Sequence, residues 1–201
     1  MGCDQSTRER VLDIATRLFA ELGYDETSLG LVADAVGLSV AEIDEEFGGK
    51  RGLYLNVYRH LHEQELDVVD ALGEVADHDS MHRFVDVYLA HLKARPERAA
   101  LWLQRRLHDA ADIREVERTY LSPQVERAVK AAENLFRPGI DPELALWTVA
   151  WTAQAYTLAS VPGEPADAEE THERILAHLH RFADLLMERR EEGHGHGASA
   201  P

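Results

Sequence analysis

The sequence predicts an all-α protein of about nine helices, in a three-helix N-terminal domain and a larger helical C-terminal domain. Apolar residues recur at helical spacing almost throughout, whereas valine, isoleucine and threonine never gather into the alternating runs that are typical of strands. Capping residues, glycines and prolines also divide the chain at intervals that fit separate helices. With 201 residues, 45% of them apolar, the chain is long enough to bury a packed core.

Four helices are predicted in the first third of the chain. The first begins near Ser6 or Thr7 and ends at Gly23, with an apolar stripe of Val11, Leu12, Ala15, Leu18, Phe19 and Leu22. A short second helix follows Ser28 and stops at Gly37, because glycine readily adopts the left-handed conformation that ends a helix. Ser39 caps a third helix over about 40–47. A long fourth helix is predicted over about 50–74.

The remaining helices are predicted over about 80–94, 96–109, 112–136, 142–160 and 167–190, with Pro and Gly at their boundaries. We therefore expect residues 1–50 to form the N-terminal domain, with a helix-turn-helix at about 28–47. Residues 51–190 would form the larger C-terminal helical domain. Residues 191–201 are small, polar and rich in Gly and His, which favours a disordered tail.

The second and third helices, joined by residues 36–39, match a helix-turn-helix, in which the second helix lies in the DNA major groove. Gly37 permits the tight turn, Leu38 fills the angle between the helices and Ser39 caps the second. Around this motif the order and spacing of residues resemble the N-terminal domain of the TetR family: Ile14-Ala15, Leu18-Phe19, Gly23-Tyr24, Thr27-Ser28, Val32-Ala33, Val36-Gly37-Leu38-Ser39, Phe47, Lys50 and Leu53.

The resemblance covers about the first quarter of the chain by motif and the remainder by helix number and length. It implies a homodimeric, ligand-responsive transcriptional regulator, usually a repressor. In that family a small molecule binds in the C-terminal domain and moves the fourth helix, which changes the spacing of the two recognition helices. The dimer of the family is built from the last two long helices, and no catalytic activity or cofactor is implied.

The expected DNA-binding residues lie at helix starts and on the third helix: Arg8, Arg10, Thr27, Ser28, Ser39, Val40, Ala41, Glu42, Asp44 and Lys50. The third helix departs from the family pattern, because Asp44 stands where an aromatic residue is usual. Residues 24–50 carry seven acids and one base. Lys and Arg supply much of protein–DNA affinity, and each carboxylate near a phosphate costs on the order of 1 kcal/mol in water.

Two hypotheses therefore stay open at the level of sequence. In the first, the protein binds operator DNA and a small apolar or aromatic effector. In the second, a TetR-fold protein has lost operator binding and serves as a small-molecule-binding, partner-binding or catalytic protein. The net charge of −16 argues against general attraction to nucleic acid, so any DNA binding would depend on specific contacts.

The C-terminal domain offers candidates for both a pocket and a dimer interface. Aromatic or polar residues within apolar helices are the expected pocket residues: Leu66, Phe84, Tyr88, His91, Trp102, Arg105, His108, Tyr120, Trp151 and Gln154. The dimer interface is expected on the last two helices, at Trp147, Ala155, Leu158, Leu179, Phe182 and Leu186.

Several other functions receive no support from the sequence. The chain has no phosphate loop, nucleophile elbow or HExxH zinc motif, so we expect neither an enzyme nor a cofactor. Its 11 histidines show no spacing of three metal ligands, and no metal site is predicted. A lone Cys3, no secretion signal and no apolar run of about 18 residues favour a cytoplasmic protein without membrane contact.

Overall fold

The computed structural model describes residues 4–65, 68, 70, 73, 75–107, 109–159 and 169–187. The predicted positions Leu66 and His108 and the predicted tail 191–201 lie outside this part of the chain. The described residues form nine α-helices and one π-helical segment: α1 (Gln5–Glu26), α2 (Leu29–Val36), α3 (Val40–Phe47), α4 (Gly49–Gln64), α6 (His78–Ala94), α7 (Pro96–Arg106), η1 (Glu117–Leu121), α8 (Ser122–Ala131), α9 (Pro142–Ala159) and α10 (Glu169–Leu186). The predicted all-α class is confirmed.

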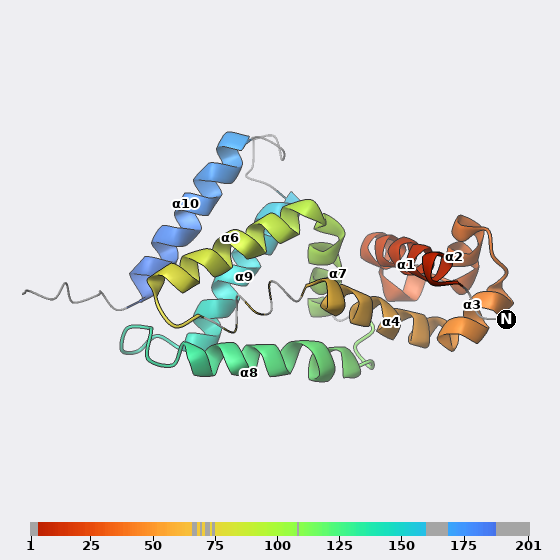
Figure 1. Ribbon diagram of the computed structural model, residues 1–201, viewed down its shortest axis with the longest axis horizontal. Helices are drawn as coiled ribbons and strands as arrows, with labels where there is room; N and C mark the ends of the chain where they lie inside the picture. Colours follow the sequence, from red (N-terminus) through yellow and green to blue (C-terminus); the bar gives the residue numbers. More distant parts are fainter. Residues whose placement is uncertain are drawn as a thin grey trace, which may run out of the picture.

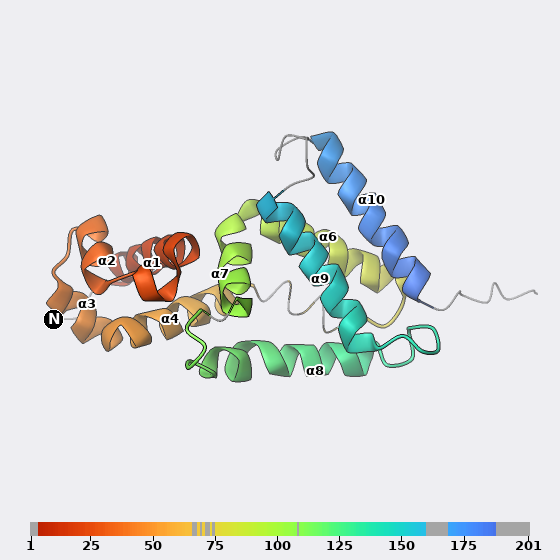
Figure 2. The same ribbon diagram turned by 180° about the vertical axis from the view of Figure 1, so that it is seen from behind.

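The helices form two bodies joined by α4 (Figures 1 and 2). Helices α1, α2 and α3 gather around one end of α4 and share a core in which Phe19, Ile43 and Leu53 are fully buried. Helices α6, α8, α9 and α10 form the second body, with a separate core that includes Met81, Leu89 and Leu179. Helix α7 packs against both α1 and α9, so it connects the two bodies.

Helix α1 differs from its prediction at both ends. Its N-cap is Asp4, whose carboxylate accepts the Thr7 N–H, rather than Ser6 or Thr7. Gly23 leaves the helical conformation as expected, at φ 80° and ψ 172°, but a short turn continues to Glu26. The Thr27 hydroxyl donates to the Gly23 carbonyl over 2.8 Å, which holds this kink closed. The sequence does not show this bond, because it depends on where the chain returns after the kink.

The predicted helix over 112–136 is shorter and less regular than expected. Residues up to Arg114 form turns, Glu117–Leu121 is π-helical, and α8 begins at Ser122. The Ser122 N–H donates to the Glu117 carbonyl, which is the wider spacing of a π-helix. Pro123, which follows directly, has no N–H to donate to the helix before it. Such an interruption often marks a functional site, and Leu121 lies on the wall of the cavity described below.

Candidate functional site

The helix-turn-helix is built by three local signals of the sequence. Ser28 caps α2 by accepting the Leu31 N–H, and Gly37 ends α2 in the left-handed conformation at φ 72°. Ser39 and Glu42 form a reciprocal capping box at the start of α3. Ala33 is 1% exposed in the shared core of α1, α2 and α4, where a small side chain is required. These bonds fix the angle between the two short helices.

Two of the four acids of α3 are engaged within the protein. The Glu42 carboxylate accepts from the Ser39 N–H over 2.8 Å and from the Ser39 hydroxyl over 2.7 Å. These donors lower the pKa of Glu42. Glu46 lies 3.3 Å from Arg8 Nε in an ion pair. The remaining acids, Asp44 and Glu45, are exposed on the helix surface.

The solvent face of α3 can thus be defined by its exposed residues other than Glu42, whose carboxylate is engaged by Ser39. We call Val40, Ala41, Asp44 and Glu45 the α3 face; all four are exposed, and Val40 is 48% exposed. Ile43 and Phe47 point into the core instead. A face of two small apolar residues and two carboxylates can contact thymine methyl groups and accept hydrogen bonds from cytosine amino groups.

The basic residues expected at DNA have intramolecular partners. Arg8 donates to Asn56 Oδ1 over 2.7 Å besides its ion pair with Glu46, and Arg10 donates to the Val36 carbonyl over 3.0 Å. Lys50 donates to the Asp25 carbonyl over 3.0 Å. All three therefore orient the helices of this domain. To reach a phosphate, each would have to exchange or share these bonds.

The expectation for Thr27 needs correction. Its side chain is 1% exposed, and its hydroxyl donates to the carbonyls of Gly23 and Leu18 inside the fold. A buried hydroxyl that is already bonded cannot reach a phosphate. Ser28 and Ser39 are exposed, so their placement is compatible with the expected contact.

A cavity with about 840 Å³ of empty space, its open mouth included, lies in the second body between α6, α7, α8 and α9. Five of the predicted pocket residues line it: Phe84, Tyr88, His91, Trp102 and Gln154. Sequence reasoning missed other lining residues, of which the most informative are Glu65, Arg106, Leu146 and Trp147.

Three predicted pocket residues do not line this cavity. Arg105 is directed into the turns after α7, where it donates to the carbonyls of Asp109 and Ile113 and pairs with Glu117. Tyr120 lies beside His62, with ring centroids 5.3 Å apart. Trp151 is 45% exposed on the outer side of α9. These positions correct our prediction.

One end of the cavity carries three connected polar groups. Arg106 Nη1 donates to Gln154 Oε1 over 2.6 Å, and Gln154 Nε2 donates to the Tyr88 hydroxyl over 2.5 Å. The guanidinium also lies over the rings of Trp147 and Trp151, at 4.9 and 5.5 Å. Burial raises the pKa of Tyr88 to about 12, so this phenol stays protonated at neutral pH.

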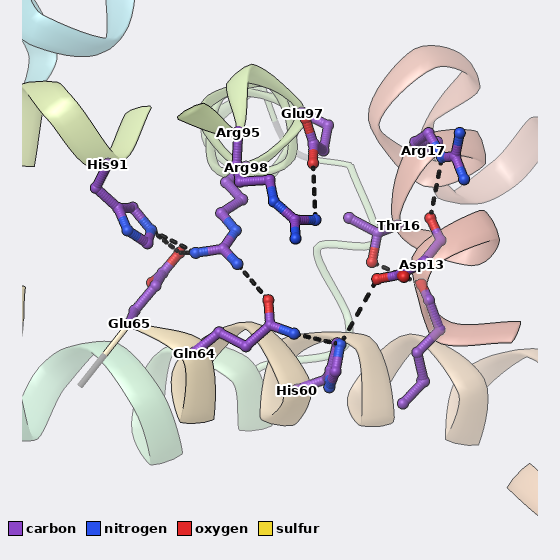
Figure 3. Close-up of polar contacts among 11 residues, drawn as sticks. Asp13, Thr16, Arg17, His60, Gln64, Glu65, His91, Arg95, Glu97 and Arg98 are labelled. Carbon is purple, nitrogen blue, oxygen red and sulfur yellow. Dashed lines mark hydrogen bonds and ion pairs between the residues drawn. The ribbon is translucent and has the colours of Figure 1, made fainter. Parts of the chain in front are cut away.

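A polar network extends from the cavity to α1 (Figure 3). Glu65 and His91 line the cavity and both contact Arg98, whose side chain is 4% exposed. Arg98 also donates to Gln64, and Gln64 bonds to His60 over 2.7 Å. His60 in turn lies 3.7 Å from Asp13 on α1. The network therefore crosses from α6 and α7 through α4 to the N-terminal body.

A chain of aromatic rings runs in parallel with this network. Trp102 on the cavity wall contacts Tyr58, and Tyr58 contacts Tyr54, with ring centroids 5.1 and 5.0 Å apart. Tyr54 contacts Tyr24 at 4.9 Å, and Lys50 lies over the Tyr24 ring. The Tyr24 N–H also donates to both oxygens of Asp109, in the turns after α7. The cavity wall and the helix-turn-helix domain are thus joined by direct packing.

The outer side of α9 and α10 exposes large apolar side chains. Leu144, Trp151 and Leu158 are spaced by seven residues on α9 and are 57%, 45% and 37% exposed, and Leu185 on α10 is 65% exposed. We call these four residues the α9–α10 face. Residues seven apart lie on the same side of a helix, so the three on α9 form one stripe. A stripe of this kind on a monomer indicates an interaction surface.

The predicted interface residues occupy several places. Leu158 belongs to the α9–α10 face and Ala155 is exposed beside it. Trp147 lines the cavity, and Leu179 is 1% exposed in the core. Phe182 and Leu186 are half-buried against that same core. Leu144 and Leu185 were missed, although their spacing from Leu158 and Phe182 is visible in the sequence.

The described residues also bear on metal binding and on membrane insertion. In that part of the chain, no group of three or more His, Cys, Asp or Glu side chains is placed to hold a metal ion. None of the helices described there is long and apolar enough to cross a membrane.

Known proteins match the segment that contains the helix-turn-helix. The family model of bacterial regulatory proteins of the tetR family matches residues 11–57. The HTH-type transcriptional regulator AcrR of Shigella flexneri is 39% identical over 54 residues, which are 27% of this chain and 25% of that protein. The matched segment thus spans about a quarter of this curated relative.

Solved structures resemble the chain over nearly its whole length. A TetR family transcription regulator from Marinobacter aquaeolei has a TM-score of 0.67 at 22% identity, over 92% of this chain and 98% of that one. A transcriptional regulator from Saccharomonospora viridis, solved in complex with choline, has a TM-score of 0.65 at 20% identity, over 92% and 100%. The helix-turn-helix domain of this chain thus belongs to the tetR family of bacterial regulatory proteins, and the chain as a whole has the fold of TetR-family transcriptional regulators.

Proposed function

We propose that the protein is a homodimeric transcriptional regulator that binds operator DNA through α3 and a small effector in the C-terminal cavity. The observation that carries the proposal is the arrangement of the acids on α3. Because Glu42 caps the helix and Glu46 pairs with Arg8, only Asp44 and Glu45 remain for DNA on the α3 face. Two carboxylates can read cytosine amino groups, whereas four on one short helix would chiefly repel phosphates.

Affinity for the backbone would come from groups around the α3 face. Arg8, Arg10 and Lys50 donate to carbonyl, amide or carboxylate oxygens, and each has further N–H groups that can bond to a phosphate. Few cations are involved, so we expect a shallow dependence of binding on salt. Repression is the expected sign of regulation, since a protein seated on a promoter excludes other proteins.

The dimer is proposed to form through the α9–α10 face. This face exposes Leu144, Trp151, Leu158 and Leu185 and lies on the body away from α3 (Figures 1 and 2). A two-fold axis through it would join α9 and α10 of one protomer to those of its partner in a four-helix bundle. Two α3 helices would then be presented together, as half-sites of an operator require.

The effector is proposed to act through the contacts that join the cavity to the helix-turn-helix domain. A molecule that fills the cavity touches Trp102 directly, and Trp102 packs on Tyr58 of α4. It also reaches Glu65 and His91, which contact Arg98, and Arg98 on α7 bonds in turn to Gln64 at the end of α4. A shift of either group would move α4 and, with it, the α3 face. The similar structure from Saccharomonospora viridis was solved in complex with choline, which supports a small-molecule site in this fold.

The test is fluorescence anisotropy with DNA from the protein's own promoter region and with random DNA of equal length, at low and near-physiological salt. We expect submicromolar binding to the promoter DNA and a clear preference over random DNA. An Ala41→Glu variant should lose this preference, because it adds a third carboxylate to the α3 face. Leu31→Glu, at an exposed position of α2, is the matched control for charge.

A second candidate is favoured by the intramolecular bonds of the three cations. If those bonds are not exchanged, the protein is a TetR-fold small-molecule-binding protein without an operator. Equal binding of promoter and random DNA at low salt, together with an intact dimer, would support this second candidate over the first.

A further inference from the structure

The charge inside the cavity is unbalanced at Arg106. Its guanidinium is half-buried and bonds to the neutral amide of Gln154 and to the faces of two tryptophans. Within the described residues, no carboxylate pairs with it. Burial lowers the pKa of Arg106 because desolvation disfavours the charged form, yet an arginine stays charged at neutral pH. A half-buried cation without a counter-ion is costly unless a ligand supplies one.

Among the described residues that line the cavity, the one acid, Glu65, is already compensated. Glu65 lies 3.8 Å from Arg98 Nη1 and 3.4 Å from His91 Nε2. Its charge is therefore balanced by the network that leads to α1 (Figure 3). The excess charge of the cavity lining is the positive charge of Arg106.

The direction of the hydrogen bonds also indicates that a negatively charged acceptor is missing beside Arg106. Arginine can only donate, so the Gln154 oxygen must face Arg106 and its amide NH₂ must face Tyr88. The Tyr88 oxygen accepts that bond, which leaves its own proton to donate. The described residues provide no acceptor for this proton. Arg106 and Tyr88 thus present donors at one end of the cavity, and an acceptor of negative charge would satisfy both.

The rest of the cavity is apolar. Phe84, Leu92, Trp102, Ala128 and Leu146 form walls that favour an aliphatic or aromatic body. Trp151 lies outside the cavity, half exposed, and its ring also contacts the Arg106 guanidinium. The guanidinium therefore stands between the apolar interior and solvent, where the charged head of an amphipathic molecule would lie.

We infer that the effector is an amphipathic organic anion, with a carboxylate bound by Arg106 and Tyr88 and an apolar body in the cavity. This inference rests on the proposed effector site and goes further by giving the chemical class of the ligand. It differs from the choline-bound neighbour, whose ligand carries a positive charge. Charge-assisted bonds from arginine to a carboxylate give both affinity and orientation.

The test compares probes that share a body and differ in the head, by isothermal titration calorimetry on the full chain at pH 7.5. One series is decanoate, 1-decanol and decyltrimethylammonium, and the other is 2-naphthoate and 2-naphthalenemethanol. We expect at least one carboxylate to bind tenfold or more tightly than its alcohol. Arg106→Gln should reduce that ratio below threefold and leave the affinity for the alcohol unchanged, while Arg106→Lys should keep part of the ratio. Arg181→Gln, an exposed arginine on α10, is the matched control.

Equal binding of acid and alcohol, tighter binding of the ammonium probe, or no binding of any probe would overturn the inference. A folded Arg106→Gln protein that still binds the carboxylate tenfold more tightly than its alcohol would also overturn the inference. Promoter anisotropy on the same preparations keeps this result separate from the proposed function. Operator binding without a carboxylate preference refutes only the inference, whereas a carboxylate preference without operator binding refutes only the regulator.

Discussion

The kink at Gly23 ties the helix-turn-helix domain to the second body, and Gly23→Ala tests that connection. Gly23 has φ 80° and ψ 172°, a combination that side chains other than glycine rarely adopt. A Cβ at this position would lie 3.2 Å from Asp109 Oδ1, the atom that accepts the Tyr24 N–H over 2.8 Å. The substitution would therefore strain the backbone and press on the carboxylate that joins α1 to the turns after α7.

The loss of stability in Gly23→Ala can be worked out from backbone strain, the weakened hydrogen bond and the entropy of the unfolded chain. Backbone strain in this region costs about 1–3 kcal/mol. Weakening a hydrogen bond to a charged, partly buried carboxylate adds about 1 kcal/mol. Alanine lowers the entropy of the unfolded chain, which returns about 0.5 kcal/mol to the folded state. We expect Gly23→Ala to lower the free energy of unfolding by about 1.5–3.5 kcal/mol.

Gly37→Ala is the matched control, because Gly37 also has a positive φ, 72°, but a Cβ there would meet no atom within 4 Å. It should cost about 1 kcal/mol. Urea denaturation followed by circular dichroism, at one protein concentration, measures both. If Gly23→Ala costs no more than Gly37→Ala, the contact with Asp109 does not contribute as the structure indicates.

Three further predictions concern the α3 face, the cavity and the dimer. Glu45→Gln should strengthen promoter binding about threefold to fivefold in anisotropy titrations by removing a carboxylate from the α3 face. Glu42→Gln should instead lower the free energy of unfolding by about 0.5–1 kcal/mol in urea denaturation, because it weakens the capping box. If Glu42→Gln strengthened promoter binding as much as Glu45→Gln, the different roles given to these two acids would be contradicted. The unfolding free energy should fall as pH rises from 10 to about 12, because burial raises the pKa of Tyr88 and Tyr54 to about 12 and also raises the pKa of Tyr58, so the unfolded chain releases these protons first. Tyr88→Phe should make that slope shallower, and an unchanged slope would refute the burial of this phenol. Trp151→Glu together with Leu185→Glu should yield monomers in light scattering at micromolar concentration, and a persistent dimer would place the interface elsewhere.

Local signals explain why the helix-turn-helix was predicted well. Ser39 and Gly37 act on the residues beside them, so capping and turn formation depend only on nearby sequence. The partners of Arg8 and Thr27 were not predicted. Arg8 bonds to Asn56, 48 residues away, and Thr27 is buried by a kink whose other support is Asp109. Such partners depend on how the helices pack and are not encoded in a local pattern.

The residues that line the cavity were predicted only in part, because they too depend on how the helices pack. Helix α9 is apolar on all sides, so its periodicity does not tell which of Trp147 and Trp151 faces inward. The structure places Trp147 at the cavity and Trp151 outside it. Arg105 and Arg106 are adjacent on α7 and point about 100° apart, and the sequence could not decide which of them lines the cavity.

The central claim is that the α3 face recognises DNA although two of its four residues are acidic. The most direct measurement is a hydroxyl-radical footprint of the wild-type protein on its own promoter region. We expect two protected half-sites that are related by a two-fold axis and lie about one helical turn, or a multiple of it, apart. Both should be lost in Ala41→Glu. Uniform cleavage along the promoter, at protein concentrations that give a folded dimer, would contradict the claim.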